Sequence, residues 1–202
     1  MQTVFEAAGG MDGLRRLADA WHRRVMADEV VGHAFSHGFH PQHVERLAAY
    51  WAEALGGPSA YSDSYGDETT VVKMHSGNGE HDEMDRRAIA CFDQALADVG
   101  LAYDGALRQV LHDYFAWATT TTMSRYHESA DDVPSGLSIP HWSWDGDSRS
   151  NSSATSETIT VHGEGIARYT SSFGPPCKGL PNLFRPAETG TAMDRKRNVE
   201  LF

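Results

Sequence analysis

The chain carries eleven histidines, and a neutral imidazole can bind a metal as well as donate or accept a proton. His75 ends the short apolar segment VVKMH and is followed at once by Ser, Gly and Asn. Such a segment predicts a single turn of helix that stops and presents the imidazole to the space between helices. Haem iron is commonly bound by one imidazole in an apolar slot. The local sequence leaves two interpretations of His75 open, an iron ligand and a solvated loop histidine.

His22 and His43 lie beside apolar stripes on expected helices. His22 adjoins the stripe of the first long helix, so it can reach a cavity lined by that stripe. His43 lies one turn before Leu47 and shares its face of the second helix. Two interpretations remain for both residues: groups that line a site, and amphipathic side chains at the edge of the core.

The histidine series H-x3-H-x2-H-x2-H is a further candidate for metal binding, with zinc or another divalent ion as the candidate metal. Structural zinc sites usually include cysteine, but no cysteine is near this series, and the H-E-x-x-H motif of metallohydrolases is absent. A solvated interpretation is therefore favoured over a dedicated metal site. The series consists of His33, His37, His40 and His43. Four other histidines are expected at the surface: His81, His112, His127 and His141.

Composition excludes several classes of function. The formal net charge of -11 argues against nucleic acid and anionic membranes as partners, because both select positive surfaces. No apolar run approaches the roughly 18 residues of a membrane-spanning helix. There is no G-x-S-x-G motif, and Cys91 lies on an apolar helical stripe, so nucleophilic catalysis has no support. Two cysteines and no apparent signal peptide predict a cytoplasmic protein.

Four amphipathic helices are expected to position these side chains. Apolar residues recur with helical period over residues 12–28, 41–55, 81–99 and 104–127. Asp12 is the expected N-cap of the first helix, and the GGP sequence at 56–58 is expected to end the second. Residues 58–80 are rich in Gly, Ser, Asp and Asn and are expected to be irregular. No useful period of two occurs in the first 146 residues, so the predicted fold class is all-α.

The order of these pieces resembles the truncated haemoglobins, most closely their second group. The resemblance is carried by VFEAAGG, LRRLADAWHRRV, Phe35, GGP, Tyr61-Ser62, VVKMH and RRAIACFDQAL, over about residues 4–126. It implies a 2-on-2 globin-like helical sandwich with a short proximal helix or loop. An irregular C-terminal extension would follow this sandwich.

The resemblance implies that His75 is the proximal iron ligand and that Phe35 packs on the porphyrin. Tyr61 and Met74 belong to the matching motifs and are expected among the residues that contact haem. The sequence RHAPF, typical of the family after the proximal site, is here MHSGNG. Contacts to the haem propionates therefore cannot be transferred from the family.

On the distal side the chain departs from its relatives. His22 stands where the family usually has a tyrosine that hydrogen-bonds the ligand, and Ala88 stands where the second group typically has a tryptophan. His43 matches the distal histidine position of larger globins, and Leu47 matches the apolar residue one turn later. The resemblance therefore implies a pocket whose donors are imidazoles.

The function implied is binding of O2, NO or CO at the sixth site of iron in haem b. The haem would be non-covalent, because no C-x-x-C-H motif is present. NO- or peroxide-linked redox chemistry and an electron-donating reductase are compatible with such a site. In a variant of this hypothesis, His22 or His43 ligates the iron when no gas is bound. Two alternatives stay open: a peroxidase-like haem enzyme that uses a distal histidine, and a haem-free helical module that binds a protein partner.

Three regions are expected along the chain. Residues 1–130 form the truncated-globin domain, and residues 131–146 form an extension packed on or near it. Residues 147–202 are rich in Ser, Thr, Pro and Gly and are expected to be a disordered tail. The sequence HWSWDG in the extension has no counterpart in the minimal family fold, and it could cover an apolar groove.

Overall fold

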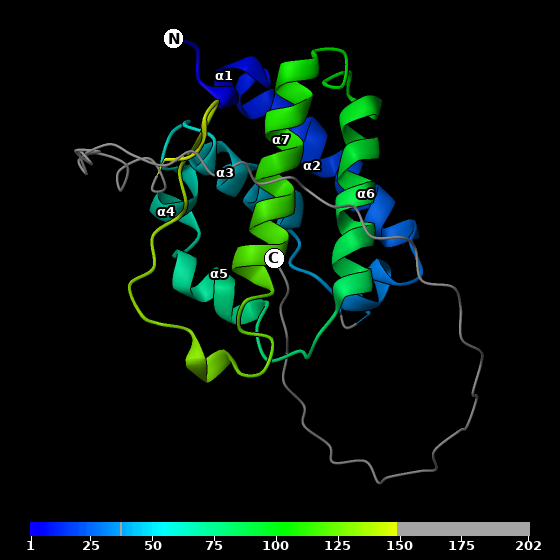
Figure 1. Cartoon of the computed structure of the whole chain (residues 1–202), viewed down its shortest axis with the longest axis vertical. Helices are drawn as coiled ribbons and strands as arrows, with labels where there is room; N and C mark the ends of the chain where they lie inside the picture. The colour runs from blue at the N-terminus through cyan, green and yellow to red at the C-terminus, as the bar shows by residue number, and fades with distance from the viewer. Residues whose placement is uncertain (37, 149–202) are drawn as a thin grey trace, which may run out of the picture. The chain divides into compact units, whose positions relative to one another are not determined.

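The computed structural model describes residues 1–36 and 38–148 (Figure 1). Four long α-helices are connected by shorter elements. The long helices are α2 (Gly10–Ala27), α3 (His43–Ala54), α6 (Asp82–Asp98) and α7 (Gly105–Trp117). The shorter helices are α1 (Val4–Ala7), η1 (Val31–Phe35), α4 (Ala60–Ser64), α5 (Glu68–Met74), the π-helix η2 (Ala118–Met123) and η3 (Ala130–Asp132). The predicted all-α class is confirmed.

The first long helix begins earlier than predicted. Helix α2 starts at Gly10, and its N-cap is Gly9 in a left-handed conformation with φ of 88°. Asp12 therefore lies inside the first turn, where its carboxylate interacts favourably with the helix dipole, and it is not the cap. The prediction failed because a glycine at positive φ can turn the chain directly out of α1.

Helix α3 ends as its sequence predicts. Gly56 has φ of 88°, and the amide of Gly57 donates to the carbonyl of Ala52 at 2.8 Å. A Cβ on Gly57 would lie 2.7 Å from that carbonyl oxygen and 2.8 Å from the ring of Phe5. A side chain at this position is therefore excluded by the close approach of α1.

The connection over residues 58–80 is more regular than predicted, because it contains α4 and α5. The side chain of Asp67 accepts a hydrogen bond from the amide of Thr70 at 2.7 Å and caps α5. Helix α5 ends at Met74, and His75 is its C-cap residue. Gly77 follows with φ of 74°, so the helix stops immediately after the histidine.

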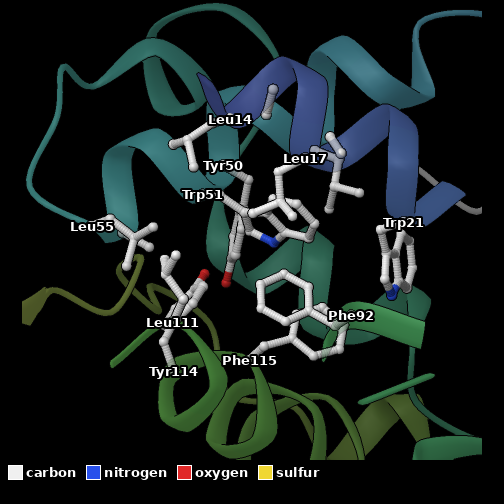
Figure 2. Close-up of a cluster of buried hydrophobic side chains, with 14 of the residues drawn as sticks. Leu14, Leu17, Trp21, Tyr50, Trp51, Leu55, Phe92, Leu111, Tyr114 and Phe115 are labelled. Carbon is white, nitrogen blue, oxygen red and sulfur yellow. The ribbon is translucent and has the colours of Figure 1, made fainter. Parts of the chain in front are cut away.

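The core forms where the long helices meet. Helix α2 packs against α3 and α6, and α6 and α7 lie side by side (Figure 1). Figure 2 shows apolar and aromatic side chains from these helices converging on one cluster. Within it, Phe92 and Phe115 stack with ring centroids 4.1 Å apart, and Trp51 meets both rings edge-on. Burial of this aromatic surface is the main force that holds the helices together.

The chain after α7 remains in contact with the helices. Strands β1 (Trp142–Ser143) and β2 (Gly146–Asp147) form a two-residue antiparallel pair that the sequence did not predict. Trp142 is buried against Tyr114 and Trp117, with ring centroids 6.0 and 5.2 Å away. The indole of Trp144 donates to the carbonyl of Gln2 at 2.8 Å. The HWSWDG sequence thus covers α7 and meets the N-terminal segment.

The predicted tail lies outside the described residues, except for residues 147 and 148. In the part of the chain that the structure describes, no helix has the length and apolar character needed to cross a membrane.

Candidate functional site

A cavity of about 440 Å³ lies among α2, η1, α3, α6 and α7, with His75 in its wall. This volume is within the range of small-molecule and cofactor sites, about 300–1,000 Å³. The wall is largely aromatic and aliphatic. Its apolar part includes Trp21, Phe35, Leu47, Trp51, Ala88 and Phe115.

The local structure of α5 fixes the ring of His75. Its Nδ1 lies 2.9 Å from the carbonyl oxygen of Val71, one turn earlier. A carbonyl can only accept, so Nδ1 carries the proton and donates, and the ring lone pair is on Nε2. Burial lowers the pKa of His75, which favours the neutral ring, although the bond to Val71 opposes the shift. A neutral imidazole with its lone pair on Nε2 is suited to bind a metal.

His43 is the first residue of α3, and it also lines the cavity. Its side chain is buried, and burial lowers its pKa to about 3, with a smaller effect from neighbouring imidazoles. The ring is therefore neutral near pH 7. Its Nδ1 is buried and has no hydrogen-bond partner within residues 1–36 and 38–148. A buried polar atom without a partner costs free energy.

His22 lies behind His43 and is not among the residues that line the cavity. The two ring centroids are 4.7 Å apart, and Phe35 and Phe39 pack edge-on against the His22 ring. Burial is also the main cause of a lowered pKa for His22. The structure therefore places one of the two predicted distal histidines in the cavity wall and the other beside it.

The indole of Trp21 meets the backbone of α6 at Ala88. Trp21 of α2 donates from Nε1 to the Ala88 carbonyl at 3.2 Å, and its ring stacks on His43 at 6.5 Å between centroids. The indole N–H of Trp21 is thus held by the protein backbone. Phe35, Leu47 and Ala88, which the resemblance places near the haem, all line the cavity.

Two other predicted contact residues lie elsewhere. Tyr61 is buried in the core, where its ring meets Tyr50 edge-on at 5.4 Å, and it is not part of the cavity wall. Met74 is half-buried against the core and is also not part of the wall. Sequence matching placed both residues near the site but could not determine the direction of their side chains.

Several residues of the wall were not predicted. Tyr50 and Tyr114 line the cavity, and both had a detectable signal, because they lie on or next to apolar helical stripes. His81 also lines it, which corrects its predicted place among surface histidines. Its Nδ1 is 2.9 Å from the carboxylate of Asp85, one turn into α6. His81 and Asp85 are four residues apart at the start of α6, a spacing that brings side chains on a helix together, but it does not show that His81 reaches the cavity.

The described part of the histidine series does not form a metal site. Among residues 1–36 and 38–148, no three His, Cys, Asp or Glu side chains are placed to hold a metal ion together. His37 lies outside the described residues. His33 lines the same cavity as His43.

Comparison with solved structures identifies the same fold in truncated haemoglobins. The group II truncated haemoglobin of Bacillus anthracis superposes with a TM-score of 0.54 and 21% identity, covering 61% of this chain and 91% of that chain. The haemoglobin of Chloroflexus aurantiacus gives 0.53 and 25%, with 61% and 98% covered. The thermostable haemoglobin of Thermobifida fusca gives 0.52 and 27%, with 60% and 97% covered. A comparison with curated proteins finds no match.

The all-α fold and the largely apolar cavity bordered by His75 are typical of a globin. Residues 3–119, more than half of the chain, match the model of the bacterial-like globins. The chain belongs to the bacterial-like globin family. Family membership implies haem iron as the cofactor and a diatomic gas as the ligand. The predicted resemblance to truncated haemoglobins and the predicted 2-on-2 globin-like fold are both confirmed.

Proposed function

We propose that His75 binds the iron of a non-covalent haem b through Nε2, and that the protein binds O2, NO or CO in the cavity. The observation that carries this proposal is the 2.9 Å hydrogen bond from Nδ1 of His75 to the Val71 carbonyl. It fixes both the tautomer and the direction of the ring, as is usual for a metal-binding histidine. When bound, haem supplies an iron atom with a sixth coordination site for the gas.

The residues present fit such a group. Phe35, Leu47 and Ala88 give the cavity an apolar wall, and His75 supplies the imidazole. His43 adds a neutral imidazole to this wall.

His43 acts in this proposal as the hydrogen-bond donor to the gas. Its neutral ring carries one N–H, and that N–H stabilises a ligand that acquires negative charge. A hydrogen bond to a charged group contributes about 1.5–3 kcal/mol, or about ten- to hundredfold in dissociation. His22 packs against the His43 ring and positions it.

Direct ligation of the iron by a distal histidine is an alternative that applies to His43, because His22 does not line the cavity. The peroxidase-like alternative is less well supported. A pKa of about 3 makes His43 a weak base near pH 7, whereas efficient general bases have pKa values near the working pH. The haem-free module is disfavoured by membership in a haem-binding family.

An electron donor must keep the iron ferrous if O2 is the ligand. We therefore retain a reductase as a proposed partner. We also propose that the protein is cytoplasmic.

Absorption spectra of the ferric, ferrous and CO-bound protein test the proposal. We expect a Soret band that shifts when CO is added, and loss of haem in His75→Ala. His141→Ala is the matched control, because that imidazole is exposed and its removal should leave the spectrum unchanged. A colourless protein that shows no Soret band after haem is added would contradict the proposal. A ferric spectrum with two nitrogen ligands would instead favour ligation by His43.

A further inference from the structure

Helix α5, which has His75 as its C-cap, is in contact mainly with the chain that follows η2. Among the described helices and strands, η3 is the element that α5 contacts most, and Figure 1 shows the two close together. The amide of Leu137 donates to Oγ1 of Thr69, in the first turn of α5, at 3.0 Å. Residues 124–148, which we call the strap, follow the part of the chain that matches the globin family model. The support of α5 therefore comes from outside the matched region.

Two further hydrogen bonds join the strap to the loop that follows α5. The amide of Gly77 donates to the carbonyl of Tyr126 at 3.0 Å, and the amide of Gly79 donates to the carbonyl of His127 at 2.9 Å. His75 is therefore attached to the strap on both sides along the chain, before it through α5 and after it through the loop.

The strap has its own anchors on the long helices. At its start, the hydroxyl of Ser124 donates to the carboxylate of Asp85 in the first turn of α6. Near its end, Ile139 and Trp142 are buried as members of the main hydrophobic core. Burial of these apolar side chains stabilises the strap against α7 and the cluster around it. A segment anchored at both ends can hold α5 in one position instead of moving with it.

Two glycines in the loop differ in how closely the strap approaches them. Gly77 has φ of 74° and Gly79 has φ of 81°, so a side chain strains the backbone at both positions. A Cβ on Gly77 would lie 3.2 Å from the amide nitrogen of Ala130 in the strap, whereas a Cβ on Gly79 has no atom within 4 Å. Alanine therefore strains the loop at either position but presses on the strap only at Gly77.

We propose that the strap positions His75, and that its contacts with α5 and the following loop determine how strongly the imidazole binds haem iron. This inference rests on the proposed function, because His75 is an iron ligand only in the haem-bound protein. The hydrogen bond to Val71 orients the ring within α5. The strap places α5 as a whole, so that the ring meets the iron at a defined distance and angle. Thr69 and Gly77 are the positioning residues on the α5 side of these contacts.

The test is resonance Raman spectroscopy of the ferrous full-length holoprotein, in which the iron–histidine stretching band reports the strength of that bond. Thr69→Val removes the acceptor of the Leu137 amide with little change of shape, and Thr69→Ser keeps the hydroxyl. We expect the band to move to lower frequency in Thr69→Val and to stay in place in Thr69→Ser. Loss of haem to an excess of a haem-accepting apoprotein should be about two- to tenfold faster in Thr69→Val, the effect of one lost hydrogen bond.

Gly77→Ala and Gly79→Ala form a second, matched pair. We expect a lower and broader iron–histidine band in Gly77→Ala and an unchanged band in Gly79→Ala. A single band position in the unmodified protein, Thr69→Val and Gly77→Ala overturns the inference, even where unfolding becomes easier, because a merely structural role leaves that frequency unchanged. Equal shifts in the two glycine variants also overturn it, since backbone strain alone would then be the cause.

Failure of the inference is distinguishable from failure of the proposed function. A Soret band that depends on His75, together with an iron–histidine band that none of the variants moves, refutes the positioning role and leaves the proposed function intact. If the unmodified protein binds no haem, or if its Soret band survives in His75→Ala, the proposed function fails and the inference fails with it.

Discussion

Replacing His43 with leucine removes the imidazole that the structure places in the cavity wall and leaves an apolar side chain there. The proposed hydrogen bond to a ligand that acquires negative charge contributes about 1.5–3 kcal/mol. Each 1.4 kcal/mol is a factor of ten in an equilibrium or dissociation constant. We therefore expect O2 to dissociate about ten- to hundredfold faster from His43→Leu. Dissociation of CO should change much less, because bound CO acquires little charge.

Stopped-flow displacement of O2 from the ferrous protein measures this rate. His22→Leu is the matched control, because His22 lies 4.7 Å from His43 between ring centroids and does not line the cavity. Its effect should be smaller than that of His43→Leu. Equal O2 dissociation rates in the unmodified protein and in His43→Leu would refute the assignment of the donor. A larger effect in His22→Leu would show that the two histidines have the opposite roles.

Further measurements test the fold and the buried polar groups. Gly57→Ala should lower the free energy of unfolding by about 1–3 kcal/mol, because its Cβ would lie 2.8 Å from the ring of Phe5. Gly105→Ala is the control, because a Cβ on Gly105 meets open space and should not lower that free energy. Tyr114→Phe removes a buried hydroxyl with no partner in the described chain and should raise that free energy by about 1 kcal/mol in chemical denaturation; a lower value would contradict this. The pKa of His43 is about 3 in the folded protein and 6.5 ordinarily, so the unfolded chain takes up a proton between these values while the folded protein does not. The free energy of unfolding should therefore fall as the pH is lowered from 6.5 to 3, by up to about 1.4 kcal/mol per pH unit. Denaturation followed by circular dichroism should show a weaker dependence of this free energy on pH in His43→Leu.

The helices were largely predictable because their signal is local. Apolar residues at helical spacing identified α2, α3, α6 and α7, and the ends differ by a few residues. Asp12 was wrongly assigned as a cap, because the left-handed Gly9 starts the helix earlier. Helix α4 was missed, and α5 was predicted only as a single turn at VVKMH, since helices of five and seven residues carry too few positions to show a period.

The site was predictable only in part. The segment VVKMH predicted that His75 would end a short helix, and the hydrogen bond to Val71 makes that position suited to a ligand. The sequence could not distinguish the places of His22 and His43, because both adjoin apolar stripes. Only the packing of α2 against α3 puts one of them in the wall and the other behind it.

The sequence by itself determined the all-α class, the order of the long helices and the family resemblance. These depend on periodicity and on motifs within short stretches of chain. The tertiary structure alone decided which side chains meet. The indole of Trp21 reaches a carbonyl 67 residues away, and Tyr50 reaches a carboxyl group 18 residues away. Contacts of this kind depend on how the helices pack, and helix packing is determined by the whole core rather than by any one segment.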